Sequence, residues 1–132
     1  MSRILPEHLR KLSYEAYRKD AKDCDILLYE PYDFWGRAIC NRTRGPFCHA
    51  AAVLWWSNRL VVVQYTEGVG GYAAPLRHEL TKRGAIHVYR VPLEEEGEKA
   101  KGIAHSLFER LGGDYDWGSI IMLGLAELPV VR

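Results

Sequence analysis

The chain of 132 residues has the length of one domain, and its composition, with 48% hydrophobic and 27% charged residues, is typical of a soluble globular protein. Its 18 Lys and Arg nearly balance its 17 Asp and Glu, so the overall charge gives no reason to expect nucleic acid or an anionic membrane as a partner. Every apolar run is far shorter than the roughly 20 residues that cross a bilayer, so no transmembrane segment is expected.

The first predicted element is a helix over residues 6–22, with Pro6 in its first turn. Its apolar residues recur at helical spacing: Leu9, Leu12, Ala16 and Tyr17. We interpret residues 1–24 as an N-terminal helical extension, which either lies against the following domain, residues 25–132, or joins it to something else. Charged residues in the first turns do not match a secretory signal peptide, so a cytoplasmic location is the default expectation.

Short apolar runs bounded by turn residues predict four strands: residues 25–29, 48–56, 60–65 and 85–91. The second and third strands are separated only by residues 57–59, which predicts a tight β-hairpin. Helices are predicted on either side of this hairpin, over residues 33–42 with Asp33 as the N-terminal cap, and over residues 75–82. Residues 67–72 are rich in glycine and predict a flexible loop that folds over a cleft.

Residues 94–111 have the clearest helical pattern, with acidic residues in the first turn and an apolar stripe. The apolar segment 118–128 is also predicted to be helical, and we expect self-association through residues 120–131. Strands joined largely as a meander, with helices packed outside them, make the expected fold class α+β with an antiparallel sheet. The four tryptophans are expected to pack in the core and at its rim.

His49 is the strongest candidate for a functional residue. It opens a predicted strand, and the three alanines that follow leave room for its imidazole to face a cleft. An imidazole titrates near working pH and can activate a thiol or a hydroxyl. Gln64, on the partner strand of the hairpin, can hold the ring in one tautomer, and Glu67 is the acidic alternative. The competing interpretation is a histidine hydrogen-bonded at the edge of the core and a glutamine that faces solvent.

None of the three cysteines is a convincing nucleophile. Cys48 adjoins His49, but neighbours on a strand point to opposite faces of a sheet. Cys40 lies in a predicted helix and suits packing, and Cys24 precedes Asp25, whose negative charge raises the pKa of a thiol. The cysteines lack CxxC spacing and the other histidines are scattered, so no metal or other cofactor is expected.

A set of short motifs, taken in order, resembles the circularly permuted papain-like cysteine peptidases of the NlpC superfamily, YiiX-like branch: CDILLYEP, GPFCHAAAV, LVVVQYTEGVGG, IHVYRVP and GGDYDW. The resemblance covers about residues 25–117 and implies a permuted papain-like (NlpC-type) fold. It also implies that His49 is the catalytic histidine and that Gln64 stands where the family usually has an acidic residue. The pair Tyr115-Asp116 matches a Tyr-Asp pair that we take as structural.

The resemblance implies a cysteine peptidase or amidase, in which a thiolate attacks an amide or ester carbonyl while His49 takes and returns the proton. The implied partners are peptide or amide substrates of cell-wall or lipid origin, and the implied source is bacterial or phage. The family's nucleophilic cysteine lies in a Cys-Ser-Glu-type motif, which these residues do not contain. Three alternatives stay open: a fragment, an inactive shortened member, or a nucleophile from elsewhere. An inactive member would be a binding module rather than an enzyme.

Overall fold

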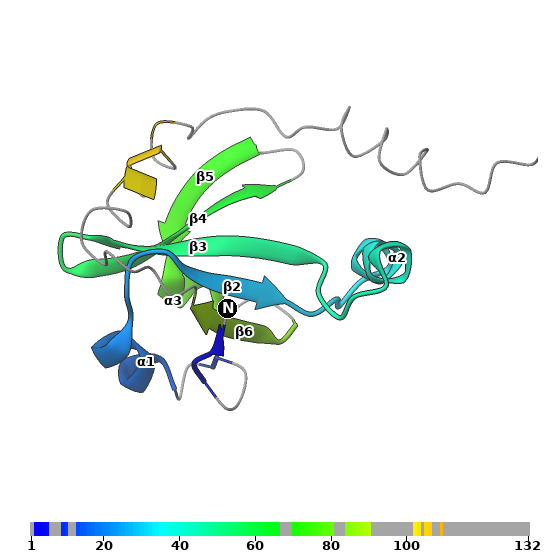
Figure 1. Cartoon of the computed structure of the whole chain (residues 1–132), viewed down its shortest axis with the longest axis horizontal. Helices are drawn as coiled ribbons and strands as arrows, with labels where there is room; N and C mark the ends of the chain where they lie inside the picture. The colour runs from blue at the N-terminus through cyan, green and yellow to red at the C-terminus, as the bar shows by residue number, and fades with distance from the viewer. Residues whose placement is uncertain are drawn as a thin grey trace, which may run out of the picture.

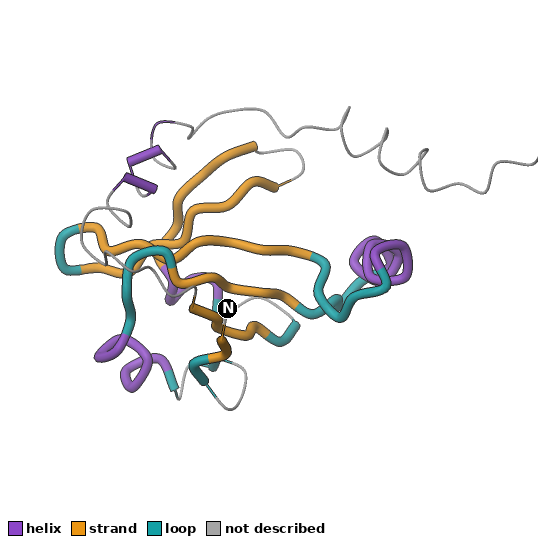
Figure 2. The backbone as a smooth tube through the Cα atoms, viewed as in Figure 1, coloured by secondary structure: helices purple, strands orange, loops and turns teal. Residues whose placement is uncertain are grey.

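The computed structural model describes residues 2–5, 9–10, 13–66, 70–80 and 84–90, together with residues 102, 103, 105, 106 and 109. These residues form an antiparallel sheet of six strands and several short helices (Figures 1 and 2), so the predicted α+β class with an antiparallel sheet is confirmed. Of the helix predicted over residues 94–111, the five described residues are helical. Tyr115-Asp116 and the segment 118–131 lie outside the described residues.

The strands are β1 (Ser2–Arg3), β2 (Asp25–Tyr29), β3 (His49–Trp56), β4 (Arg59–Thr66), β5 (Gly70–Pro75) and β6 (Ile86–Arg90), and their order across the sheet is β1-β6-β2-β3-β4-β5. The helices are α1 (Tyr14–Asp20), α2 (Phe34–Thr43) and α3 (Leu76–Glu79). All four predicted strands are present, and β3 and β4 form the predicted hairpin. Among the described residues, no helix is long and apolar enough to cross a membrane.

The glycine-rich segment was wrongly predicted as a loop. Its second half belongs to β5, which pairs with β4 from Val61↔Pro75 to Thr66↔Gly70. Glycine has a low strand propensity, and Gly70 takes a left-handed backbone conformation with φ of 79°, so the local sequence gives little strand signal. Pairing along β4 supplies the backbone hydrogen bonds that local propensity does not indicate. Residues 67–69 lie outside the described part of the chain.

The N-terminal helix is shorter than predicted, because it begins at Tyr14 rather than near Pro6. Ser13 and Arg10 form a local turn in which the Ser13 hydroxyl accepts a hydrogen bond from the Arg10 amide (2.9 Å), in place of helical bonding. Leu9 is buried and donates its amide to the carbonyl of Ile86 (2.7 Å). Together with β1, which pairs with β6, these contacts attach the N-terminal segment to the sheet.

The core lies on one face of the sheet, where α1 and α3 pack against it. Buried residues alternate with more exposed ones along β2 and β6, as expected for strands with one face in a core. The largest members of the core are Leu9, Tyr14, Tyr17, Leu27, Val53, Leu60, Val62, Leu76, Ile86 and Val88. On the opposite face of the sheet, Leu54 and Val63 are also buried.

Two tryptophans contradict the expectation of core or rim packing. Trp35 on α2 is 70% exposed and Trp56 at the end of β3 is 58% exposed. Trp55 follows the expectation: it is half-buried, and its indole Nε1 donates to the carbonyl of Ala21 (2.9 Å). Trp117 lies outside the described residues. Trp35 is exposed because α2 stands away from the sheet (Figure 1), so the large side chains of this helix have no core to enter. Trp56 is exposed at the end of β3, next to the hairpin turn.

Candidate active site

The candidate residues meet at one end of the core face of the sheet. His49, the first residue of β3, pairs in register with Tyr29, the last residue of β2. Gln64 lies near the end of β4 and pairs with Tyr72 of β5. The imidazole and the glutamine are diagonal neighbours across the β3–β4 ladder, close enough for long side chains to interact. Four adjacent strands therefore bring these four side chains together.

A chain of two hydrogen bonds fixes the histidine. His49 Nε2 lies 2.6 Å from Gln64 Oε1, and Gln64 Nε2 donates to the Tyr72 hydroxyl (2.8 Å). A carbonyl oxygen only accepts, so Nε2 of the imidazole carries the hydrogen and donates it to Gln64. In the neutral ring, Nδ1 is then the nitrogen with a free lone pair. The arrangement selects the tautomer in which Nδ1 is the base.

Gln64 is buried, which contradicts the alternative in which it faces solvent. Its exposed fraction is 3%, whereas His49 is only half-buried. A buried amide needs partners for its oxygen and its nitrogen, and the imidazole and the Tyr72 hydroxyl supply one each. The predicted contact between the two strands is therefore observed, with Tyr72 as a further member. A role of His49 or Gln64 in catalysis stays a prediction.

Tyr29 forms one wall against the imidazole. Its ring centroid lies 5.1 Å from that of His49, and the two planes are tilted by 59°. The Tyr29 hydroxyl donates to Oε2 of Glu79 on α3 (2.9 Å), and the Glu79 side chain is fully buried. Burial and the nearby charge of Glu79 hold the pKa of Tyr29 well above its ordinary value, so its hydroxyl stays a donor. This bond fixes the ring beside His49.

The cysteine thiols are poorly placed as nucleophiles. Burial raises the pKa of the Cys48 thiol, and the electrostatic effect of the nearby Cys40 raises it further. This thiol faces α2 and donates to the carbonyl of Tyr29 (3.6 Å). The Cys48 sulfur lies so close to α2 that a Cβ added at Gly36 would be 3.2 Å from it. Burial, with smaller effects from Asp23 and Asp25, also raises the pKa of the Cys24 thiol, as the sequence indicated for Asp25.

The other described histidines belong to separate environments. His87 lies between Arg3 and Glu30, with 2.6 Å from Nδ1 to the guanidinium and 3.2 Å from Nε2 to the carboxylate. Its register partner is Leu28, the neighbour of Tyr29 in β2, so His87 lies on the sheet face opposite His49. The exposed His105 pairs with Glu109 (2.9 Å). Within the described residues, no group of three or more His, Cys, Asp or Glu side chains could hold a metal ion.

Three side chains at this site were not predicted from the sequence: Tyr29, Tyr72 and Glu79. Tyr72 was assigned to a loop, although a polar residue in an otherwise apolar strand, Gln64, indicates that a partner strand must satisfy it. No local signal marks Glu79, because its partner Tyr29 lies 50 residues earlier in the chain. No protein-family model matches the chain, and no curated protein matches it either.

The tautomer of His49 can be measured directly. We expect nitrogen-detected NMR of the imidazole at neutral pH to show hydrogen on Nε2 and a free lone pair on Nδ1, because Gln64 Oε1 accepts from Nε2. Gln64→Ala should remove this preference and mix the two tautomers. His78, which is exposed on α3, serves as the control and should give the same spectrum in both proteins. Hydrogen on Nδ1 of His49 in the unchanged protein would show that the amide is oriented the other way.

Proposed function

We propose that this chain carries the base half of a cysteine peptidase or amidase site, with His49 as the general base and Gln64 as its positioning residue. The hydrogen bond of 2.6 Å between His49 Nε2 and Gln64 Oε1 is the observation that supports it best. An amide that accepts from the histidine performs the orienting task in Cys-His-Asn sites of papain-like proteases. The order of the sequence motifs, which resembles the permuted papain-like peptidases, agrees with this assignment.

The chemistry follows from the tautomer. Nδ1 takes the proton of a thiol, the thiolate attacks the carbonyl carbon of an amide, and the imidazolium returns the proton to the amine that leaves as the C–N bond breaks. Water, deprotonated by Nδ1, then cleaves the resulting thioester and regenerates the thiol. Gln64 orients the ring but, as a neutral amide, stabilises the imidazolium less than a carboxylate would. The Tyr72 hydroxyl holds the amide in place, and the Tyr29 ring limits rotation of the imidazole.

In this proposal the thiol is none of the three cysteines of the chain. Cys24 and Cys48 have raised thiol pKa values, and both would be protonated at neutral pH. We therefore assign the nucleophile to a residue other than these cysteines. The same two thiols favour a second candidate, a papain-like domain without chemistry that serves as a binding module. Peptides or amides of cell-wall or lipid origin are the proposed substrates.

Thiol alkylation across about pH 5 to 9 tests the proposal, using an iodoacetamide-alkyne probe on the protein encoded by its complete reading frame. With Cys24, Cys40 and Cys48 replaced by Ser, we expect one remaining thiol to react fast at the acidic end of this range. His49→Ala should slow that thiol about 100-fold or more, because the imidazolium that stabilises the thiolate is lost. His78→Ala is the matched control and should have no effect.

Two other results would change the assignment. If no thiol depends on His49, the hydrolase proposal fails and the binding module stands. If the fast thiol disappears when Cys24, Cys40 or Cys48 is replaced, the hydrolase stands but the nucleophile lies within these residues.

A further inference from the structure

Large apolar side chains gather on α2 and the residue before its cap. Six large hydrophobic residues are exposed in the described part of the chain, and four of them lie here. Phe34 is 75% exposed, Trp35 70%, Tyr32 56% and Ile39 42%. The rings of Phe34 and Trp35 meet edge to face, with centroids 5.8 Å apart. An exposed apolar cluster on one helix indicates a surface that binds a protein or a membrane.

The helix turns its own large side chains away from the body of the protein. Gly36 is its only buried residue, and a Cβ there would lie 3.0 Å from Pro31 Cβ. Cys40, one turn later, is half-buried on the same side. Phe34 and Trp35 lie on the other side of the helix, and Ile39, three residues after Gly36, lies at the border between the two sides and is less exposed. α2 therefore has small residues inward, and its large apolar residues and its arginines are exposed.

The charge of α2 has a single sign. Arg37 and Arg42 lie in the helix and Arg44 is its C-terminal cap, all three exposed, whereas the helix contains no Asp or Glu. The nearest carboxylate, Asp33, caps the N-terminus by accepting from the Gly36 amide (2.7 Å). The balanced charge of the whole chain therefore conceals a basic segment. Arginines beside an apolar face suit contact with a negatively charged partner.

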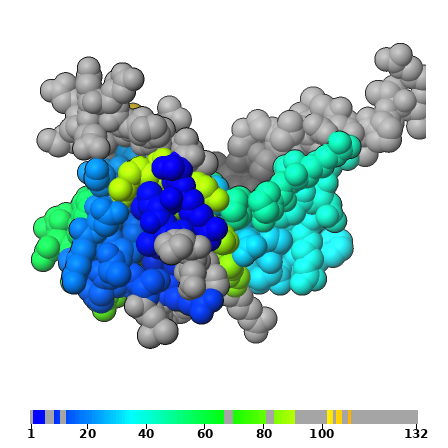
Figure 3. All heavy atoms as spheres, turned by 60° about the horizontal axis from the view of Figure 1, so that its bottom comes forward, coloured from blue at the N-terminus to red at the C-terminus, as the bar shows by residue number. Residues whose placement is uncertain are grey.

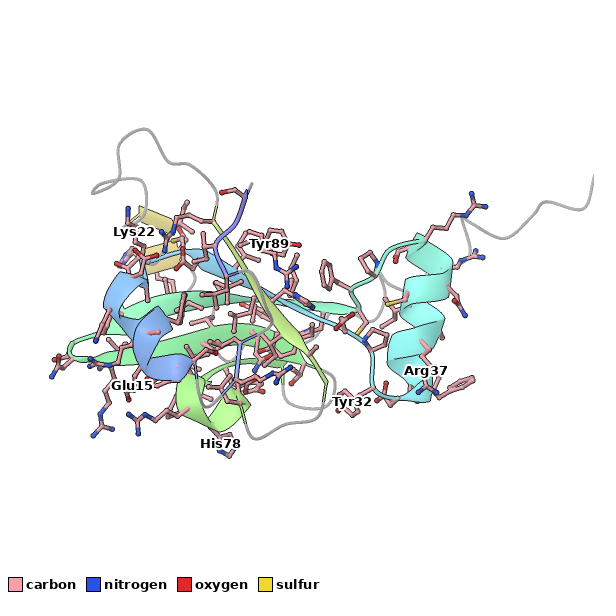
Figure 4. All side chains as sticks on the ribbon, turned by 90° about the horizontal axis from the view of Figure 1, so that it is seen from below. Glu15, Lys22, Tyr32, Arg37, His78 and Tyr89 are labelled. Carbon is pink, nitrogen blue, oxygen red and sulfur yellow. The ribbon has the colours of Figure 1, made fainter. Side chains whose placement is uncertain are left out.

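The position of α2 leaves this face accessible. The helix stands at one end of the described part of the structure, beyond the ends of β2 and β3 (Figures 1 and 4). In the space-filling view, the cyan segment that contains it forms a lobe beside the blue and green body (Figure 3). Arg37 lies on this helix, whereas Tyr32 lies between it and the sheet, beside Gly84 (Figure 4). A convex helix at the outer end of the described structure can lie flat on a surface.

We propose that α2 docks the protein on an anionic lipid bilayer, with Phe34, Trp35 and Ile39 inserted at the boundary between headgroups and acyl chains and the arginines against the lipid phosphates. Exposed aromatic and aliphatic residues together with arginines on a short helix are the composition of helices that lie in the membrane interface. Each arginine near such a surface adds electrostatic attraction. The proposal is independent of any catalytic role of His49.

Two other occupants fit the same face less well. A second copy of the chain, paired face to face through α2, would bring Arg37, Arg42 and Arg44 of both copies together without a carboxylate on either helix. Single-stranded nucleic acid is bound in grooves in which successive bases stack on aromatic rings. α2 presents a convex face that includes the aliphatic Ile39 instead.

Co-sedimentation with vesicles tests the docking. We expect the protein to bind vesicles of phosphatidylglycerol mixed with phosphatidylcholine at least about tenfold more tightly than vesicles of phosphatidylcholine alone, and added salt should weaken the binding. Arg37→Gln should lower the partition coefficient roughly fivefold, and Arg37→Gln with Arg42→Gln more than tenfold. Phe34→Ser with Trp35→Ser should abolish binding, because the inserted apolar surface is removed.

The hairpin between β3 and β4 offers a matched control. Trp56 and Arg59, also an exposed tryptophan and arginine, lie there away from α2, and Trp56→Ser with Arg59→Gln should leave vesicle binding unchanged. Equal loss in this control would overturn the proposal, as would equal binding to both kinds of vesicle or no binding to either. A dimer that dissociates in Phe34→Ser, without vesicle binding, would assign the face to a second copy. Binding of a single-stranded oligonucleotide without binding of vesicles would assign this face of α2 to nucleic acid.

Discussion

Arg90→Leu is expected to lower the free energy of unfolding by about 3–5 kcal/mol, because it leaves a buried carboxylate without its counter-charge. Asp25 is fully buried, and both of its oxygens accept from the Arg90 guanidinium, at 2.7 Å from Nε and 2.9 Å from Nη2. The same carboxylate accepts from the Tyr17 hydroxyl (2.8 Å) and the Lys22 amide (3.0 Å). Loss of the arginine therefore affects the contact of α1 with β2 and β6.

An exposed ion pair in the same protein provides the comparison. Arg77 and Glu15 are 2.7 Å apart, but their side chains are 69% and 66% exposed. Arg77→Leu should cost less than about 1 kcal/mol, because water solvates Glu15 when its partner is gone. Urea denaturation of both variants measures the difference. Equal costs would contradict the role assigned to burial.

A double-mutant cycle with Asp25→Ala separates the pair from its surroundings. Arg90→Leu destabilises the protein mainly because the buried Asp25 carboxylate loses its counter-charge, and this loss cannot occur when Asp25 is also replaced. The double variant should therefore lose less unfolding free energy than the sum of the losses in the two single variants. Additive losses would mean that Asp25 and Arg90 stabilise the fold through other contacts. The backbone carbonyl of Asp20, which accepts from Arg90 Nη2 (2.9 Å), is the first such contact to consider.

Local signals account for the part of the site that the sequence predicts. The hairpin between β3 and β4 has a short turn, which fixes the register, and the register places Gln64 near His49. The cap of α2 is equally local, since Asp33 bonds an amide three residues later. These features depend on residues close in sequence, and their patterns can be interpreted without the rest of the chain.

Long-range pairing accounts for what the sequence does not predict. β1 joins the sheet through β6, more than 80 residues later, and its two residues have no pattern of their own. The contact of Tyr29 with Glu79 spans 50 residues. The exposure of Trp35 depends on where α2 stands relative to the sheet, which the residue pattern of one helix does not specify. The prediction that Trp35 is buried was wrong because α2 does not pack against the core.

Alkaline pH is expected to destabilise the protein through two tyrosines, the buried Tyr17 and the half-buried Tyr29. Burial, and then the charges of Asp25 and Glu79 respectively, hold both pKa values well above the ordinary value. In the unfolded chain these phenols ionise near pH 10, so the folded protein keeps protons that the unfolded chain releases. The two tyrosines therefore leave stability unchanged below about pH 9 and lower it above about pH 10, by up to about 1.4 kcal/mol per pH unit for each.

Urea denaturation at a series of pH values, with tyrosine-to-phenylalanine variants, measures this contribution. Tyr17→Phe and Tyr29→Phe should each cost about 1 kcal/mol at neutral pH, through the lost hydrogen bond, and should each make the alkaline decline shallower. Tyr32→Phe is the control, because that ring is 56% exposed in the folded protein, and its decline should match that of the unchanged protein. If Tyr17→Phe and Tyr29→Phe leave the decline as steep as before, other groups cause it.

That result would also bear on the site, because it would mean that Tyr29 has the same pKa in the folded and the unfolded protein. The Tyr29 hydroxyl would then ionise in the folded state at high pH and no longer donate to Glu79, and the ring that packs against His49 would lose this support.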